Sequence, residues 1–174
     1  MILNYLHKVG WLVGLALLQV LILNNVHIAG YATPFLYVYL ILKFESGISR
    51  NVLMLWAFAL GLVVDVFSDT PGLNVSSTVL LAFVRPFYLR LFLSRDVLES
   101  IVPSVRTMGT SSFLKYLFAC LLTHHFMLFV LEFFSFVHVG SLLLRILSST
   151  LLTIACVHGF QSFPRYARAR NFVW

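Results

Sequence analysis

The sequence predicts an all-α integral membrane protein with six transmembrane helices and both termini in the cytoplasm. Of its 174 residues, 60% are hydrophobic and only 10% are charged, whereas soluble domains carry about 25% charged residues. Apolar runs long enough to cross a bilayer recur along the chain, and lysine and arginine gather in alternate loops between them. Because so few polar groups could not cover a water-soluble fold of this size, a single transmembrane helical domain is expected over residues 1–174.

The first part of the chain is expected to cross the membrane twice. No charged residue occurs from Val9 to Leu42, and a spanning helix needs about 20 apolar residues, so this run is too long for one crossing. An asparagine pair, Gly30 and Pro34 supply the break, since such residues interrupt helices. The first two helices are therefore expected at residues 5–24 and 33–44.

Four further helices follow, each bounded by polar or helix-breaking residues. The turn Ser68–Gly72 separates the third from the fourth, Ser111 or Ser112 can cap the fifth, and Pro164 is expected to end the sixth. The second helix is the shortest, so a five-span protein without it stays an alternative. The four later helices are expected at residues 50–67, 73–93, 112–136 and 141–163.

The segment 95–102 predicts a short helix lying on the cytoplasmic membrane surface. Its apolar residues fall on one helical face and its charged residues on the other, which is typical of an interfacial helix. Pro103 would end this helix. A solvated loop is the alternative.

Lysine and arginine mark one side of the predicted bundle. The loops near 25–32, 68–72 and 137–140 contain neither residue, whereas both termini and the other two loops are basic. Because cytoplasmic loops are enriched in Lys and Arg, both termini are expected in the cytoplasm. The same basic loops could meet anionic lipid headgroups or an acidic partner. The basic residues of that side are Lys8, Lys43, Arg50, Arg90, Arg95, Arg106, Lys115, Arg165, Arg168 and Arg170.

Several function classes are excluded by the composition and by missing motifs. The formal net charge is +6, but the basic residues form short clusters rather than one basic face, which argues against nucleic-acid binding. The sequence has no P-loop, G-x-S-x-G or H-E-x-x-H motif, so a protein that is not an enzyme and has no cofactor is expected. Cys120 and Cys156 lie within apolar runs and are expected to be buried packing residues.

The histidines do not predict a metal or haem site. His124 and His158 lie at different depths in the fifth and sixth helices, so their imidazoles are not expected to face each other across a haem. His125 and Glu132 are seven residues apart on one helix face and could form half of a metal site. Since no second pair of ligands is evident, no metal is expected, and the histidines are expected to form hydrogen bonds between helices.

Apart from the basic residues at the predicted cytoplasmic side, four charged residues lie within the predicted helices: Asp65, Arg85, Glu132 and Arg145. A charge at the bilayer centre costs about 2.5–3.5 kcal/mol on insertion scales, so such groups are expected to face protein or water. Glu132 and Arg145 lie near the outer ends of neighbouring helices and are predicted to pair across their hairpin. Asp65 and Arg85 differ in depth by roughly 9 Å, so either could face a subunit or a polar cavity. Alternatively, Asp65 could cap a turn.

Small residues mark two places where helices can approach closely. Gly10 and Gly14 in the first helix, and Ala57 and Gly61 in the third, are each four residues apart. This spacing lets the backbones of membrane helices come into contact. The two pairs are therefore candidate faces for a partner helix, either within this chain or in another.

The stretch "GLVVDVFSDTPGLNVSST", residues 61–78, resembles the signature of the rod-shape-determining membrane protein family MreD. In that family a glycine-containing helix reaches an aspartate, turns, and resumes at a Gly-Leu followed by small polar residues. The size, the six-span layout and the short loops are also similar, whereas Asp69 and Asn74 depart from the family pattern. The matching positions, with the proline of the turn, are Gly61, Asp65, Pro71, Gly72, Leu73, Ser76 and Ser77.

The resemblance implies a non-catalytic subunit of the bacterial cell-elongation machinery in the inner membrane. MreD-like proteins associate with MreC, whose single transmembrane helix docks in the membrane. Together they act with the MreB filament, the glycosyltransferase RodA and its penicillin-binding transpeptidase partner. The chain would then be a scaffold that helps position the peptidoglycan synthase and maintain cell shape, with Asp65 fixing its helix against a neighbour or a partner.

The family fold is similar to the substrate-binding S-components of energy-coupling-factor transporters, and this similarity leaves an alternative. The chain would then be a transporter subunit that binds a small molecule, such as a vitamin, in a polar cavity on its outer side. The polar residues expected near that side are Asn24, Asn25, Asp65, Asp69, Asn74 and Glu132.

Overall fold

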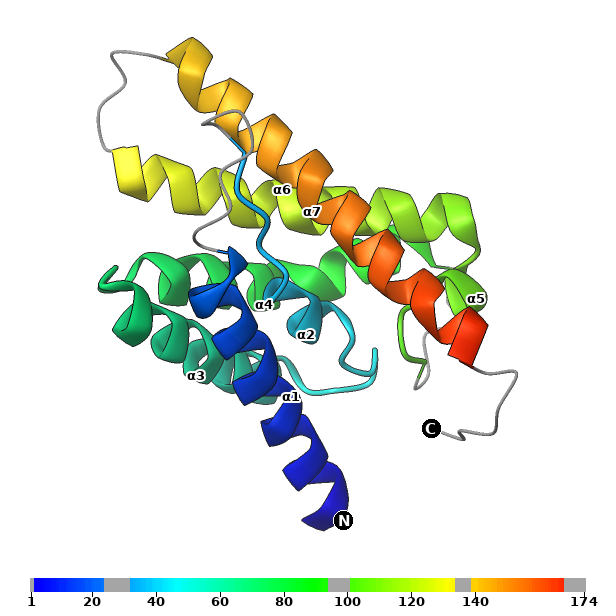
Figure 1. The fold of residues 1–174 in the computed structure, drawn as a ribbon. Helices are drawn as coiled ribbons and strands as arrows, with labels where there is room; N and C mark the ends of the chain where they lie inside the picture. Colours follow the sequence, from blue (N-terminus) through cyan, green and yellow to red (C-terminus); the bar gives the residue numbers. More distant parts are fainter. Residues whose placement is uncertain (1, 24–31, 94–100, 134–138, 168–174) are drawn as a thin grey trace.

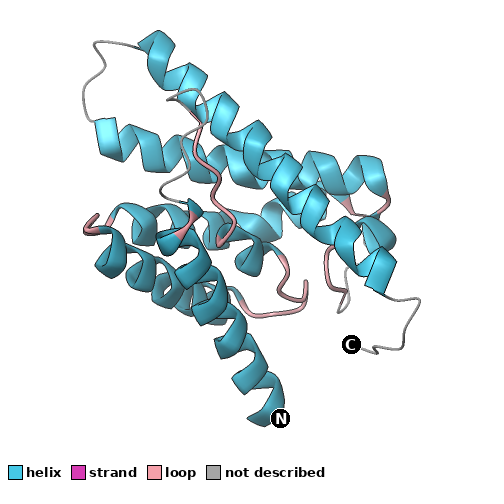
Figure 2. Ribbon diagram, viewed as in Figure 1, coloured by secondary structure: helices cyan, strands magenta, loops and turns pink. Residues whose placement is uncertain are grey.

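All regular secondary structure in the described part of the chain is helical (Figure 2), which confirms the predicted all-α class. The computed structural model describes residues 2–23, 32–93, 101–133 and 139–167, and the side chains of residues 9–159 within those ranges. The helices are α1 (Ile2–Leu21), α2 (Val38–Leu42), α3 (Arg50–Ser68), α4 (Leu73–Phe92), α5 (Val105–Met108), α6 (Thr110–Phe133) and α7 (Val139–Ala167).

Four of these helices, α3, α4, α6 and α7, are long and apolar enough to cross a membrane. α3 packs along α4, α4 along α6, and α6 against α7, while α1 contacts α3. In Figure 1 the start of α3, the end of α4 and the start of α6 lie at one end of the bundle, and the α3–α4 turn lies at the other. α7 crosses α6 obliquely. This arrangement is compatible with a multi-pass membrane protein.

The helix expected over 33–44 is present only as the five residues of α2, which follow a turn at residues 36–37 and a non-helical stretch at residues 32–35. Pro34 explains this difference in part, because it lacks an N–H and pushes the preceding residue toward extended geometry. We call the stretch from Ala32 to Phe44 the internal segment. Because extended chain rises about 3.3 Å per residue, about twice the rise of a helix, this segment covers a distance that a 12-residue helix could not.

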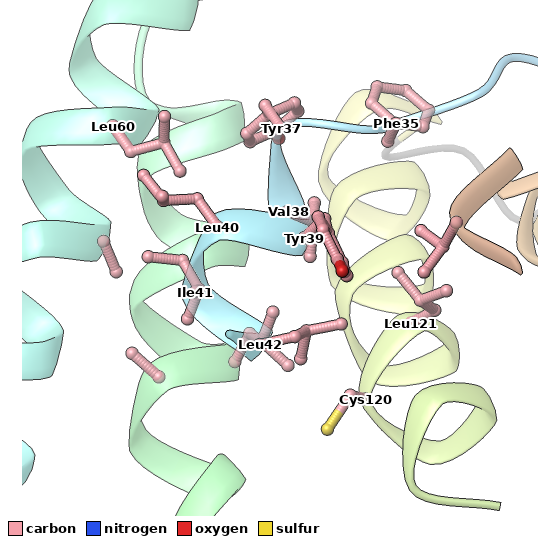
Figure 3. Packing of buried hydrophobic residues seen from close by; sticks show 14 of the residues in the cluster. Phe35, Tyr37, Val38, Tyr39, Leu40, Ile41, Leu42, Leu60, Cys120 and Leu121 are labelled. Carbon is pink, nitrogen blue, oxygen red and sulfur yellow. The ribbon is translucent and has the colours of Figure 1, made fainter. Parts of the chain in front are cut away.

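The internal segment runs through the middle of the bundle. All five residues of α2 are buried. Figure 3 shows α2 between two helices on one side and a third on the other, with Leu40 and Ile41 facing Leu60 of α3 and with Cys120 and Leu121 of α6 on the opposite side. Non-helical backbone at membrane depth is tolerated where it is buried in protein, so the apolar packing around α2 makes this path possible.

Two smaller expectations concern residues 95–102 and the end of the last helix. The predicted interfacial helix over 95–102 lies mostly outside the described residues, and Ile101 and Val102 are not helical. A short helix that the sequence analysis did not anticipate, α5, follows them, and Ser104 and Thr107 form a capping box at its start. α7 continues through Pro164 to Ala167 instead of ending before the proline.

The Ala57–Gly61 pair is used inside the chain, where it brings α3 and α4 together. Ala57 is fully buried, and its carbonyl accepts a hydrogen bond from the Thr78 hydroxyl at 3.0 Å. A Cβ added at Gly61 would lie 2.6 Å from the Cα of Val75, closer than a methyl group can approach a backbone. The candidate partner face on α3 is therefore covered by α4 and is not open to another chain.

Replacing Gly61 with Ala should force α4 away from α3 and destabilise the bundle, by about 1–3 kcal/mol as for other overpacked sites. Gly14→Ala in α1 is the matched control, because an added Cβ there has no neighbour within 4 Å. The melting temperature of each purified variant in mild detergent measures the effect. Equal melting temperatures for the two variants would contradict the close α3–α4 contact.

Candidate functional site

Asp65 caps the start of α4 from the last turn of α3. Its carboxylate, only 4% exposed, accepts hydrogen bonds from the backbone N–H groups of Gly72 at 3.1 Å, Asn74 at 3.0 Å and Val75 at 3.0 Å. The first N–H groups of a helix have no partner within the helix and carry partial positive charge. A carboxylate at this position accepts hydrogen bonds from these N–H groups and balances their partial positive charge. Asp65 of α3 therefore fixes the start of α4 at the turn between the two helices, which we call the corner.

The turn between α3 and α4 depends on two residues with left-handed backbone geometry. Asp69 has a φ of 53° and Gly72 a φ of 85°, a region that glycine adopts freely and that aspartate tolerates. Asp69 is exposed, whereas Thr70 donates its hydroxyl to Asp65 at 3.0 Å. The carboxylate that matters for the corner is therefore Asp65, and Asp69 shapes the turn through its backbone.

The residues that form and follow the turn in the stretch 61–78 also belong to this corner. Pro71 and Gly72 form the turn, and Leu73 is the first residue of α4. Ser76 donates its hydroxyl to the Gly72 carbonyl at 2.6 Å, and Ser77 donates to the Leu73 carbonyl at 2.8 Å. Each of these contacts is local and structural.

A chain of hydrogen bonds leads from the corner into the bundle. The Asn74 side chain donates to Asp65 at 2.9 Å and accepts from the Tyr37 hydroxyl at 2.7 Å. His124 Nε2 of α6 lies 3.2 Å from the same hydroxyl. These side chains are all buried. The network therefore ties α3, α4, α6 and the internal segment together.

The histidine pair on α6, His124 and His125, contacts hydrogen-bonding groups of its own helix and of neighbouring segments. His125 Nδ1 lies 2.7 Å from the Leu121 carbonyl and 3.3 Å from the Thr150 hydroxyl of α7, which agrees with hydrogen bonding between helices. His125 is fully buried whereas Glu132 is exposed, so these two do not form half of a site. Within the described residues, no three His, Cys, Asp or Glu side chains are grouped so as to hold a metal ion.

Arg85 is fully buried and binds the C-terminal end of the internal segment. Its guanidinium donates to the Leu42 carbonyl at 3.3 Å, to the Phe44 carbonyl, and to the Tyr116 hydroxyl of α6 at 2.9 Å. The carbonyls at the end of α2 have no partner within the helix and carry partial negative charge. Arg85 and Asp65 are therefore not partners of each other, since each binds the backbone end of a different helix.

Polar side chains of α1 and α7 hold the extended part of the internal segment from two sides. Gln19 of α1, fully buried, donates to the Pro34 carbonyl and accepts from the Leu36 N–H, both at 2.9 Å. Ser149 and Thr153 of α7 accept from the N–H groups of Thr33 and Phe35, both at 3.1 Å. Successive residues of an extended chain face opposite sides, so neighbouring backbone groups meet opposite helices.

Sequence reasoning did not single out Gln19, Tyr37 and Tyr116, although all three make buried polar contacts. A signal for Gln19 existed, because it is a lone amide inside an otherwise apolar run. Polar side chains inside a membrane span are expected to bond across helices. The sequence alone does not identify the partner of Gln19. The partner is the backbone of Pro34 and Leu36, in a segment that was expected to be helical.

Glu132 and Arg145 lie where α6 ends and α7 begins. The Arg145 guanidinium lies over the Phe133 ring, 4.8 Å from its centroid, and Glu132 is exposed. The ion pair between the two side chains stays a prediction. It is checked by reversing each charge alone and then both, since the double swap should restore the folded yield that the single changes lower.

Gly10 and Gly14 lie on an open face of α1. Both are exposed, as are Val13 and Leu17 beside them, and a Cβ added at either glycine would meet nothing within 4 Å. The two small-residue pairs therefore differ: the pair on α3 is covered by α4, and the pair on α1 is uncovered within the described residues.

No protein-family model matches this chain, and no significant match is found among the curated proteins or the solved structures.

Proposed function

We propose that this protein is a non-catalytic membrane scaffold of the bacterial cell-elongation complex. It would reside in the inner membrane, dock the transmembrane helix of an MreC-like protein, and through it act with MreB, RodA and a penicillin-binding transpeptidase. The observation that supports the proposal most is the corner formed by the MreD-like motif. Asp65 there accepts five hydrogen bonds from within the chain, which supports a structural role for this carboxylate.

The proposal includes six membrane crossings, with the internal segment as the second. The non-helical residues 32–35 and the turn and helix that follow, residues 36–42, together span about 24 Å, somewhat less than the roughly 30 Å thickness of the hydrocarbon region. Exposed cations lie at the end of the bundle where α3 begins and α4 ends, at Lys43, Arg50, Arg90, Arg106 and Lys115. By the positive-inside rule this end, and with it both termini, would face the cytoplasm.

The partner helix would dock on the Gly10–Gly14 face of α1. Transmembrane helices associate through close packing at small residues because lipid offers no hydrophobic driving force between them. Of the two glycine-containing faces that the sequence offers, α1 carries the one that is exposed. Val13 and Leu17, both exposed by two fifths or more, would form the rims of this contact.

The proposal is tested by affinity isolation from mild detergent, followed by identification of the co-purifying chains. The wild type should recover a single-span protein with a large domain outside the membrane, and Gly14→Ile should reduce its recovery at least about tenfold, the factor for a loss of roughly 1.4 kcal/mol. Ala155→Ile on the exposed side of α7 is the matched control and should retain the partner.

Two results would contradict the proposal. Equal recovery of the partner by the Gly14→Ile and Ala155→Ile variants would remove α1 as the docking face. Recovery of a transporter ATPase module, or of a tightly held vitamin, would instead support an S-component-like transporter subunit.

A further inference from the structure

A groove on the lipid-facing surface separates α6 from the first turns of α7. Its volume is about 460 Å³. Three of its residues, Phe126, Leu143 and Leu147, are about half exposed, so the groove opens toward the hydrocarbon. Its lining consists of Leu122, Thr123 and Phe126 of α6 and Leu143, Ile146 and Leu147 of α7.

The polar group in this lining is already engaged. Thr123 donates its hydroxyl to the Ala119 carbonyl at 2.9 Å, and it lies 2.8 Å from the Tyr88 hydroxyl of α4, which can donate to it. A molecule inside the groove would therefore meet methyl, methylene and aromatic surface. The inserted part of the occupant has to be apolar along its whole length.

The depth of the groove matches one leaflet. From Phe133, the last residue of α6, the groove residues Phe126 and Leu122 lie seven and eleven positions back, roughly 10 and 16 Å along the helix axis. Half of the hydrocarbon core is about 15 Å thick. A spanning helix would need contacts through both leaflets, whereas an acyl chain needs them in one, so the groove fits a lipid chain better than a partner helix.

The Arg145 side chain reaches toward the end of α6, the level at which a lipid headgroup would lie above the groove. The Arg145 guanidinium is on the same turns of α7 as the groove residues and stacks over Phe133, 4.8 Å from the ring centroid. Aromatic residues gather at the membrane–water interface, and a guanidinium binds phosphate oxygens through two parallel hydrogen bonds. Since it carries five N–H donors, a phosphate contact is compatible with other partners of Arg145.

We propose that α6 and α7 bind a phospholipid, with one acyl chain in the groove and the phosphate on Arg145. The groove supplies the apolar contacts within one leaflet, and the guanidinium supplies charge complementarity at the corresponding headgroup depth. This site lies on α6 and α7, away from the Gly10–Gly14 face, so it does not depend on the proposed docking of a partner helix.

Native mass spectrometry of the protein released from mild detergent tests the site, with a bacterial phospholipid of known mass added during purification. The wild type should retain one lipid. Arg145→Gln should lower the retained fraction about fivefold, as for one cation at a lipid surface, and Leu147→Trp should lower it by filling the groove. Leu151→Trp, on an exposed position of α7 outside the groove, should retain the lipid.

Equal lipid retention in all four proteins would overturn the proposal. A second contradicting result would be a wild-type dimer that carries no lipid and that the Leu147→Trp substitution abolishes. The groove would then hold a second copy of the chain. Circular dichroism of each variant separates loss of the lipid from loss of the fold.

Discussion

Replacing Asp65 with Asn should lower the free energy of unfolding by about 3 kcal/mol, because several hydrogen bonds to a buried charged group are weakened at once. The carboxylate accepts from three backbone N–H groups and two side chains. An amide keeps the shape but turns one acceptor oxygen into a donor that faces other donors. The expected result is a large fall in melting temperature in detergent and in the yield of folded protein.

Asp69→Asn is the matched control for this prediction. Asp69 lies four residues further on, is exposed, and adopts left-handed backbone geometry that asparagine tolerates well. The melting temperature of this variant should stay close to that of the wild type. If the two substitutions had equal effects, Asp65 could not be the group that fixes the corner.

Replacing Arg85 with Met should also lower the free energy of unfolding by about 3 kcal/mol, because several buried acceptors lose a charged donor at once. Met has a similar length and no donor, so the carbonyls of Leu42 and Phe44 and the Tyr116 hydroxyl would lose their shared partner. Arg85→Lys should recover only part of the loss, because an ammonium lacks the planar fork that reaches several acceptors.

Arg90→Met, five residues later on α4, controls for the loss of a positive charge. Arg90 is exposed, and substitutions at such sites usually change stability by less than about 0.5 kcal/mol. The free energies of unfolding from denaturant titration in micelles compare the variants. A stability for Arg85→Met equal to that for Arg90→Met would mean that the guanidinium does not hold the end of α2.

Hydropathy placed the long helices well, because each of them is one continuous, mainly apolar run of residues that can be recognised without knowing its tertiary contacts. The expected range 73–93 differs from α4 by one residue at its end, and 50–67 differs from α3 by one. The internal segment could not be placed in this way. A helix satisfies its backbone locally, whereas this segment is satisfied by Gln19, Ser149 and Thr153, which lie far away in the sequence.

The candidate partner faces show a second limit of sequence reasoning. Gly10 and Gly14 have the same spacing as Ala57 and Gly61, so the pattern alone could not rank them. Only the packing of α4 on Gly61 separates a pair used within the chain from an exposed pair. For the same reason the sequence does not decide whether Asp65 caps a helix or contacts a partner, because the donors that reach its carboxylate depend on the turn that follows.

Side chains of four helices, α1, α4, α6 and α7, hold the mostly non-helical internal segment inside the bundle. Hydrogen–deuterium exchange of the wild type and of Thr153→Val in lipid nanodiscs, resolved to single amides, tests this claim most directly. We expect slow exchange of the Phe35 and Leu36 amides in the wild type. In the variant, exchange should be at least about tenfold faster at Phe35, which loses its acceptor, but unchanged at Leu36, which Gln19 still holds. Fast exchange of both amides in the wild type would contradict the claim.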